Sequence, residues 1–233
     1  MKKFFTLIAA VAMAASVNAQ GTYAVAVGDN VKAGDQISSV NNVTLTYCEN
    51  AGTAFAVGKK TTNWADADFG AYVCGKNSGK LVSGAAPTGC VYKFDTKVAG
   101  TLTVAVQLNA DKGFHVLGSD FAEVALASYN LPAAKDGTSQ EFTQNEKGEN
   151  MVAVKSNGAV TINAVAGGTY YVLAAGTKLG FYGFKFTAGT SGISNINASE
   201  AANEGATFNL LGQKVASNAK GLVIKNGKKF INK

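Results

Sequence analysis

The sequence contains no arginine, and lysine supplies all 21 of its basic residues. Proteins that bind nucleic acid usually place planar arginine side chains on phosphates and base edges, where two parallel hydrogen bonds form. The lysines also follow no face of an amphipathic helix, so solvent-exposed strand faces and turns account for them. We therefore expect no nucleic-acid partner.

Charged residues and proline are also scarce, at 15% of the chain and two residues respectively. Hydrophobic residues make up 47% of the chain. That fraction supplies a core and excludes a disordered protein in spite of the low charge. The chain has 27 glycines, and together with its many threonine, valine and asparagine residues they favour short strands joined by turns. The composition therefore indicates an all-β fold.

Apolar runs of the roughly 18 residues needed for a transmembrane helix are absent after residue 19. The segment before it has the pattern of a signal peptide, because Lys2 and Lys3 precede a short apolar stretch that ends in small residues. Val17 and Ala19 occupy the positions that a signal peptidase reads, so we expect cleavage after Ala19. No cysteine follows that point, which argues against a lipid anchor. We expect an exported protein without a transmembrane helix, in the periplasm, at the cell surface or in the medium.

Cysteine is limited to Cys48, Cys74 and Cys90, an odd number for an exported chain. Metal sites need a spacing such as Cys-x-x-Cys or a partner histidine, and neither is present. Cys74 ends one predicted strand and Cys90 begins another across a glycine-rich loop, so we predict a Cys74–Cys90 disulfide and one buried thiol. The alternative is that all three are small buried hydrophobic residues.

Apolar residues alternate with polar ones in several segments, which is the pattern of half-buried strands. The apolar positions are Val43, Leu45 and Tyr47; Leu102, Val104, Val106 and Leu108; Val160 and Ile162; and Tyr182, Phe184 and Phe186. Residues 168–176 are apolar on both faces, as expected of a central strand. We predict a jelly-roll-like β-sandwich over residues 20–187, a Gly/Ser/Asn-rich linker over 188–205 and a C-terminal β-hairpin segment over 206–233.

Two stretches of the predicted sandwich, "GTLTVAVQLNADKGFHV" and "GAVTINAVAGGTYYVLAAGTKLGFYGFKF", resemble a β-sandwich module of exported Bacteroidota proteins. The resemblance covers roughly residues 40–187, and its motifs are moderately specific only as a set. That module is similar to the galactose-binding-like sandwiches and carbohydrate-binding modules that are often fused to polysaccharide lyases and glycosidases. The resemblance implies a jelly-roll fold, with carbohydrate binding as one common use.

The C-terminal segment "FNLLGQKVASNAKGLVIKNGKKFINK" resembles part of a type A sorting domain of the type IX secretion route. The matching positions are Asn209, Leu210, Gly212, Gln213, Gly221, Asn226, Gly227 and Lys228. The resemblance implies docking to secretion machinery. Only about 40 residues follow the linker, whereas complete sorting domains form a small sandwich, so export across the outer membrane stays open. The alternative is that the lysines of this segment only keep an exposed strand edge soluble.

Residues for catalysis are few, since His115 is the single histidine. No Gly-x-Ser-x-Gly motif and no phosphate-binding glycine loop is present, and no carboxylate is placed by spacing to orient His115. Acidic pairs for glycoside cleavage would have to come from Asp66, Asp68, Asp120 or Glu123, and the sequence sets no distance between them. We therefore expect a noncatalytic protein.

The segment "NWADADFGAY" offers the best binding residues. Trp64 can stack on a sugar ring while Asp66 and Asp68 bind its hydroxyl groups, and Tyr72 and His115 complete the candidate platform. Asp66 and Asp68 are also a weak Ca²⁺ site; a solvated turn is the alternative, and no other cofactor is expected. We predict a glycan-binding module, with a structural or adhesive surface protein as the alternative, in which Trp64 is a core residue.

Overall fold

The computed structural model describes residues 20–49, 55, 59–60, 68–189, 207–208, 214–216, 221–225 and 228–232. The chain divides into two compact units, Met1–Thr190 and Ser191–Lys233. The described residues of both units form strands, turns and irregular segments and contain no helix. The protein is therefore all-β, as the composition predicts.

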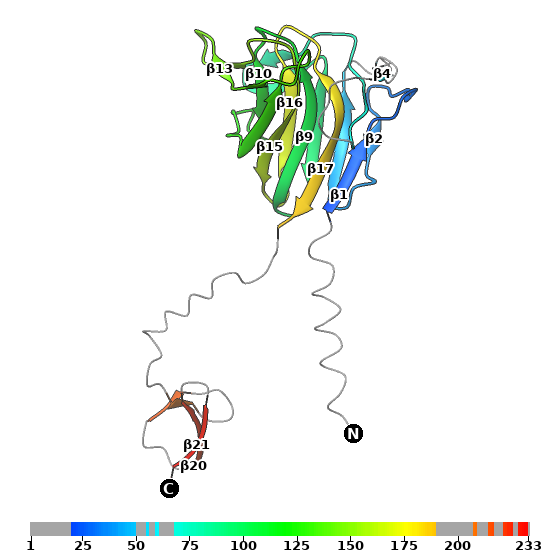
Figure 1. The fold of residues 1–233 in the computed structure, drawn as a ribbon. Coiled ribbons are helices and arrows are strands. Elements are labelled where there is room, and N and C mark those ends of the chain that lie inside the picture. The colour runs from blue at the N-terminus through cyan, green and yellow to red at the C-terminus, as the bar shows by residue number, and fades with distance from the viewer. Residues whose placement is uncertain are drawn as a thin grey trace. The chain divides into compact units, whose positions relative to one another are not determined.

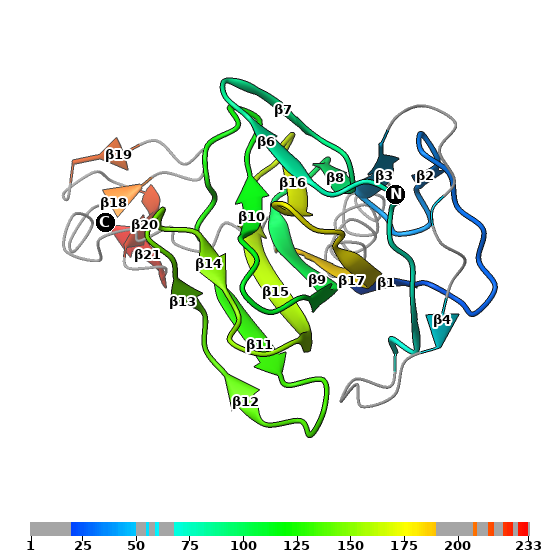
Figure 2. The same ribbon diagram turned by 90° about the horizontal axis from the view of Figure 1, so that it is seen from above.

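The first unit is a sandwich of two antiparallel sheets, which Figures 1 and 2 show as two layers. The six-stranded sheet has the order β1 (Gln20–Ala24), β17 (Gly180–Ala188), β9 (Gly100–Leu108), β15 (Ser156–Ala164), β11 (Ser128–Pro132) and β12 (Ser139–Gln140). The seven-stranded sheet has the order β13 (Thr143–Gln144), β14 (Asn150–Met151), β10 (Phe114–Leu117), β16 (Thr169–Ala174), β8 (Val91–Thr96), β3 (Val43–Cys48) and β2 (Gln36–Ile37).

The long strands cross repeatedly between the two sheets. β8, β9 and β10 alternate between them, and β15, β16 and β17 do so again, which gives the predicted jelly-roll-like sandwich. Two small hairpins complete the unit, β4 (Lys59–Lys60) with β5 (Ala71–Tyr72) and β6 (Lys80–Val82) with β7 (Ala85–Thr88).

The core lies between the two sheets and follows the predicted alternation. Val43, Leu45 and Tyr47 of β3 and the four apolar residues of β9 are at most 2% exposed. Aromatic rings fill the centre, where Tyr92 stacks on Phe181 with ring centroids 4.6 Å apart. Each buried side chain of this size contributes about 1.5–3 kcal/mol through removal of apolar surface from water. This burial holds the two sheets together.

One strand departs from the predicted alternation. The pairing of β17 with β9 shifts register between Phe181 and Gly183, which is a β-bulge. As a result Phe181, Phe184 and Phe186 face the main core, while Tyr182 packs on the opposite side of the sheet with Phe69 and Ala105. The expectation that Tyr182 shares a face with Phe184 is therefore wrong.

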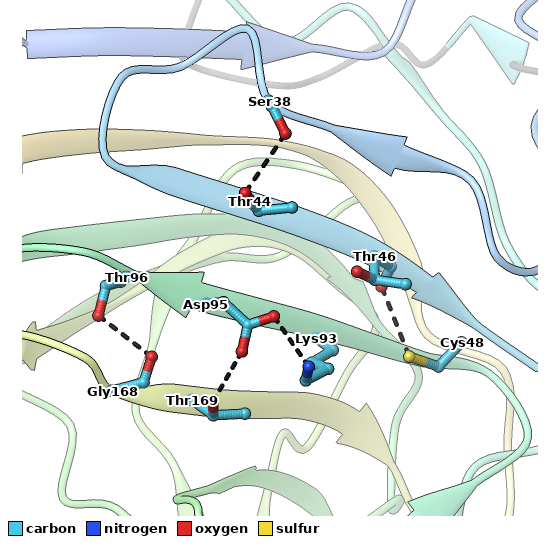
Figure 3. A network of polar contacts seen from close by, with 9 residues as sticks. All are labelled: Ser38, Thr44, Thr46, Cys48, Lys93, Asp95, Thr96, Gly168 and Thr169. Atoms are coloured by element: carbon cyan, nitrogen blue, oxygen red, sulfur yellow. Dashed lines mark hydrogen bonds and ion pairs between the residues drawn. The ribbon is translucent and has the colours of Figure 1, made fainter.

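A polar ladder covers part of the outer face of the seven-stranded sheet, where it crosses β3, β8 and β16 (Figure 3). Asp95 accepts hydrogen bonds from Lys93 Nζ at 2.8 Å and from Thr169 Oγ1 at 2.7 Å. The Ser38 and Thr44 hydroxyl oxygens lie 3.3 Å apart at the β2 end. These side chains bond to one another along and across the strands, so they find hydrogen-bond partners within this part of the face.

The second unit is a four-stranded antiparallel sheet with the order β19 (Lys214–Val215), β18 (Thr207–Phe208), β20 (Gly221–Lys225) and β21 (Lys228–Asn232). Lys225 pairs with Lys228, so two residues connect β20 to β21 as in a tight hairpin. Gly221 and Lys228 of the predicted sorting motif begin these two strands. The other motif residues, Asn209, Leu210, Gly212, Gln213, Asn226 and Gly227, lie outside the described residues.

Candidate functional site

His115 faces outward from the seven-stranded sheet and is nevertheless buried. It lies on β10 between Phe114 and Val116, whose side chains enter the core between the sheets, so the imidazole points to the opposite face. Residues 118–126 fold back along the end of β10, where the Val124 N–H donates to the Val116 carbonyl at 2.8 Å. Under this cover His115 is only 3% exposed.

Two carboxylates flank the imidazole. Glu123 pairs with Nδ1, and Glu149 Oε1 lies 3.6 Å from Nε2. That second distance exceeds a hydrogen bond, and Nε2 has no hydrogen-bond partner although it is buried. Glu123 therefore orients His115 from eight residues further along the chain, a contact that no spacing in the sequence indicated.

Glu149 is held by the turn that precedes it. Asn145 Oδ1 accepts the N–H groups of Lys147 and Glu149 at 2.9 and 3.0 Å, and Asn145 Nδ2 donates to Glu149 Oε2 at 2.6 Å. Gly148 takes a positive φ of 74° in this turn, a conformation that glycine adopts without steric cost. The turn thus fixes the carboxylate that points at His115.

A pocket of about 760 Å³ opens beside His115. Aromatic rings form one wall: Tyr129, which is 38% exposed, packs edge-on against Phe142 at 4.9 Å, and Phe142 stacks on Phe114 at 5.8 Å. The hydrogen bond from the Tyr129 hydroxyl to Glu141, 2.6 Å long, raises the pKa of Tyr129. The polar part of the lining comes from His115, Glu123, Gln144, Lys147, Glu149 and Asn150.

Sequence reasoning missed most of this pocket. Tyr129, Phe142 and Glu149 come from three segments that no motif connects. Tyr129 lies on β11 of the six-stranded sheet, and Phe142 and Glu149 adjoin β13 and β14, which extend the seven-stranded sheet beyond β10. One local signal existed, since Asn145 followed by Gly148 is a common turn composition. It would have located the turn but not its proximity to His115.

The other predicted platform residues lie elsewhere. Asp68 forms an ion pair with Lys185 at 2.9 Å, and Tyr72 on β5 packs against Tyr182 at 5.4 Å, on the outer face of the six-stranded sheet. A smaller pocket of about 300 Å³ adjoins Tyr72. His115 is on the outer face of the other sheet, so the expected grouping of His115 with Tyr72 is wrong. Trp64 and Asp66 lie outside the described residues.

Within the described part of the chain, no group of three or more His, Cys, Asp or Glu side chains is arranged to hold a metal ion. The weak Ca²⁺ prediction depends on Asp66 together with Asp68, so it stays a prediction.

The three cysteines are present as thiols in the structure. Cys90 is fully buried, and its Sγ accepts the N–H of Gly75 at 3.1 Å, so the segment that carries Cys74 lies directly against it. Burial raises the pKa of the Cys90 thiol. The Cys74–Cys90 disulfide is not formed in the structure, but the neighbouring positions keep it a testable prediction.

No protein-family model matches the sequence. No curated protein matches it at a significant level either. In the ranges that the structure describes, no helix is long and apolar enough to cross a membrane. The fold and the pocket therefore carry the functional argument.

Proposed function

We propose that this protein is an exported, noncatalytic carbohydrate-binding protein whose binding site is the pocket between Tyr129 and His115. The observation that carries the proposal is that the exposed ring of Tyr129 and several carboxylate and amide side chains line one pocket of about 760 Å³. Sugars present an apolar C–H face and a rim of hydroxyl groups. An aromatic ring packs on the first, and fixed polar groups bind the second.

Each wall has a distinct part in this proposal. Tyr129 is braced by its hydrogen bond to Glu141 and by Phe142, so its ring is a fixed surface for the sugar face. Glu123 and Glu149 accept hydrogen bonds from hydroxyl groups, while Gln144 and Asn150 both donate and accept. Such a mixture suits a neutral sugar.

The Glu123–His115 pair is the nearest approach to a catalytic arrangement, because a carboxylate orients the imidazole. The nitrogen that would accept a substrate proton is Nε2, which is buried and faces Glu149. A general base must reach the proton that it removes. This position supports a binding role for the pocket.

A structural or adhesive surface protein is the second candidate. The polar ladder in Figure 3 supports it, because Lys93, Asp95 and Thr169 bond to one another on this face. In that case the pocket beside Tyr129 would hold no sugar.

We also propose a place for the protein outside the cytoplasm, in the periplasm, at the surface or in the medium. The signal-like residues 1–19 support export, and the sorting-like residues of the C-terminal unit support a contact with secretion machinery. The sheet of that unit includes the hairpin whose sequence resembles a sorting domain of exported Bacteroidota proteins.

The test is binding of the mature protein to a panel of plant and host polysaccharides, measured by affinity electrophoresis and calorimetry. Tyr129→Ala should abolish retention, and Tyr72→Ala, on the other face of the sandwich, is the matched control that should retain it. Circular dichroism checks that both variants fold. If only Tyr72→Ala lost glycan retention, the binding site would lie at the smaller pocket beside Tyr72. If the protein were retained by no glycan, the structural candidate would be favoured.

A further inference from the structure

We infer that His115 is a positioning residue, and that the shape of the pocket depends on whether its imidazole carries one proton or two. In its charged form the imidazole ties two walls of the pocket to β10, and in its neutral form it holds only one of them. The consequence for ligand binding rests on the proposed function, whereas the change in the walls does not.

Three separate parts of the chain meet at the imidazole. His115 comes from β10, Glu123 from the segment 118–126 that folds back over it, and Glu149 from residues 145–149, the turn that leads into β14. All three of these residues also line the pocket. Any change in the two contacts of the imidazole therefore acts on both walls.

The geometry places one proton on Nδ1 of the imidazole and leaves Nε2 as the position for a second. An ionised carboxylate only accepts hydrogen bonds, so the close contact of Glu123 with Nδ1 requires a proton on Nδ1. In the neutral ring Nε2 then carries a lone pair that faces the Glu149 carboxylate at 3.6 Å, and two acceptors repel each other. A proton taken up from solvent onto Nε2 turns this contact into a charge-assisted hydrogen bond.

The charged groups that face the ring are two carboxylates and one exposed lysine. Glu123 faces the ring from the segment 118–126 and Glu149 from the β13–β14 turn, while β16 places Leu173 directly opposite on the sheet. The hairpin β6–β7 contributes Leu81 to the same pocket, and among the described lining residues Lys147 is the one lysine. Lys147 is exposed on the turn, so water screens its charge.

Gly113 leaves room for the contact. A side-chain Cβ at this position would lie 2.9 Å from Glu149 Oε2 and 3.0 Å from His115 Nε2. Any residue larger than glycine therefore pushes the carboxylate and the imidazole apart. Asn145 meanwhile holds the other side of the Glu149 carboxylate at 2.6 Å, so that the group is already aimed at Nε2.

The chain is well suited to a test without ligand, because it has a single histidine and its imidazole signals have one origin. Histidine exchanges its proton between about pH 5 and 8, and amide NMR signals of the protein without a histidine tag are followed over that range. We expect the signals of residues 145–149 to move with the imidazole signal, and the protection factors of the turn amides, which correct for the intrinsic pH dependence of exchange, to be higher at the acid end.

Two variants and one control separate a proton-linked contact from a general effect of pH. In Glu149→Gln the amide can donate to neutral Nε2 and keep the contact at every pH, so the turn should lose its response while the fold is retained. His115→Gln should lose it as well. Glu146→Gln removes an exposed carboxylate from the same turn and should respond like the wild type. A response that persists unchanged in Glu149→Gln, or no response in the wild type, would overturn the inference.

Binding of a retained glycan completes the test. Fixed walls cost less to order, so affinity should be about fivefold higher at the acid end, which is the low end of such couplings. Glu149→Gln should show equal affinity at both ends. A turn that responds to pH in a protein that retains no glycan would leave this inference standing and reject the proposed function. Equal wild-type affinity at both ends would reject the link between the proton and the pocket.

Discussion

The outer face of each sheet carries a polar cluster, and the two clusters differ in whether their buried nitrogen and oxygen atoms have hydrogen-bond partners. On the six-stranded sheet Gln107 Nε2 donates to Asn157 Oδ1 at 3.0 Å and to the Tyr182 hydroxyl at 3.2 Å, and that hydroxyl donates to Asn157 at 2.9 Å. On the seven-stranded sheet His115 has one partner on Nδ1 and none on Nε2. We call these the closed cluster and the open cluster.

The difference follows from the elements that carry the side chains. All three members of the closed cluster lie on long, paired strands, so their positions are fixed by the sheet. In the open cluster only His115 is on a strand of the main sheet, while Glu123 and Glu149 come from a folded-back segment and a turn. A fully satisfied network makes a core rigid, whereas groups on loops can rearrange when a ligand or a proton arrives.

The largest effect is expected from breaking the bulge that turns Tyr182 into the closed cluster. Gly183 has a φ of 144°, and a Cβ there would collide with the Tyr23 carbonyl and lie 2.8 Å from the Phe69 ring. Gly183→Ala should therefore lower the free energy of unfolding by about 3 kcal/mol or more, measured by urea denaturation. Gly176→Ala, with a φ of 70° and no neighbour within 4 Å, is the control and should cost only about 1–2 kcal/mol. An equal loss of unfolding free energy in Gly183→Ala and Gly176→Ala would contradict the steric role of the bulge.

The next effect comes from removing one hydroxyl group from each cluster region. Tyr182→Phe leaves Gln107 and Asn157 short of a buried partner, and should cost about 1–3 kcal/mol of unfolding free energy. Tyr129→Phe removes an exposed hydroxyl group near the open cluster and should cost less than about 0.5 kcal/mol. Thermal and urea unfolding measure both, and a larger loss for Tyr129→Phe would reverse the comparison.

A smaller change in stability is expected at Gly113, together with a clear change in pH response. The atoms that a Cβ would meet are the ends of the Glu149 and His115 side chains, which can move aside. Gly113→Ala should thus cost less than about 1 kcal/mol, yet abolish the pH response of residues 145–149 in amide NMR spectra. Gly70→Ala, which meets nothing within 4 Å, should leave both unchanged. Retention of the full response in Gly113→Ala would count against the contact between His115 and Glu149.

The smallest effect is one of reactivity, at the cysteines beside the smaller pocket. Burial raises the pKa of Cys90, so its thiol stays protonated in the folded protein at pH values where an exposed thiol, with a pKa of about 8.5, begins to ionise. Alkylation of the reduced protein should label Cys90 last, at a rate that follows unfolding. Mass spectrometry of the exported protein without reductant tests the Cys74–Cys90 disulfide, and immediate labelling of Cys74 there would contradict it.

How much of the molecule was predictable depends on the range of the interaction. Period-two alternation in β3 and β9 is a local property, because successive side chains of a strand point to opposite faces, and the sequence patterns at Leu45 and Val104 therefore identify buried positions. The tight hairpin between β20 and β21 is local in the same sense, since an Asn-Gly pair between alternating residues favours a two-residue turn.

The candidate site was not predictable in this way. His115 meets Glu123 and Glu149 because of strand register and a returning segment, and no spacing in the sequence encodes either contact. The sequence placed Tyr72 and His115 in one platform, but the crossings between the sheets put them on opposite outer faces. A single extra residue in β17 likewise sent Tyr182 away from Phe184.

By itself the sequence determined the all-β class, the main strands and the buried faces of regular strands such as β3 and β9, because these depend on neighbouring residues and on the burial of apolar side chains. The tertiary structure decided which polar side chains meet, which cluster is satisfied and which is left with an unpartnered Nε2. Those outcomes depend on pairings between distant segments, where a shift of one residue moves a side chain to the other face of its sheet.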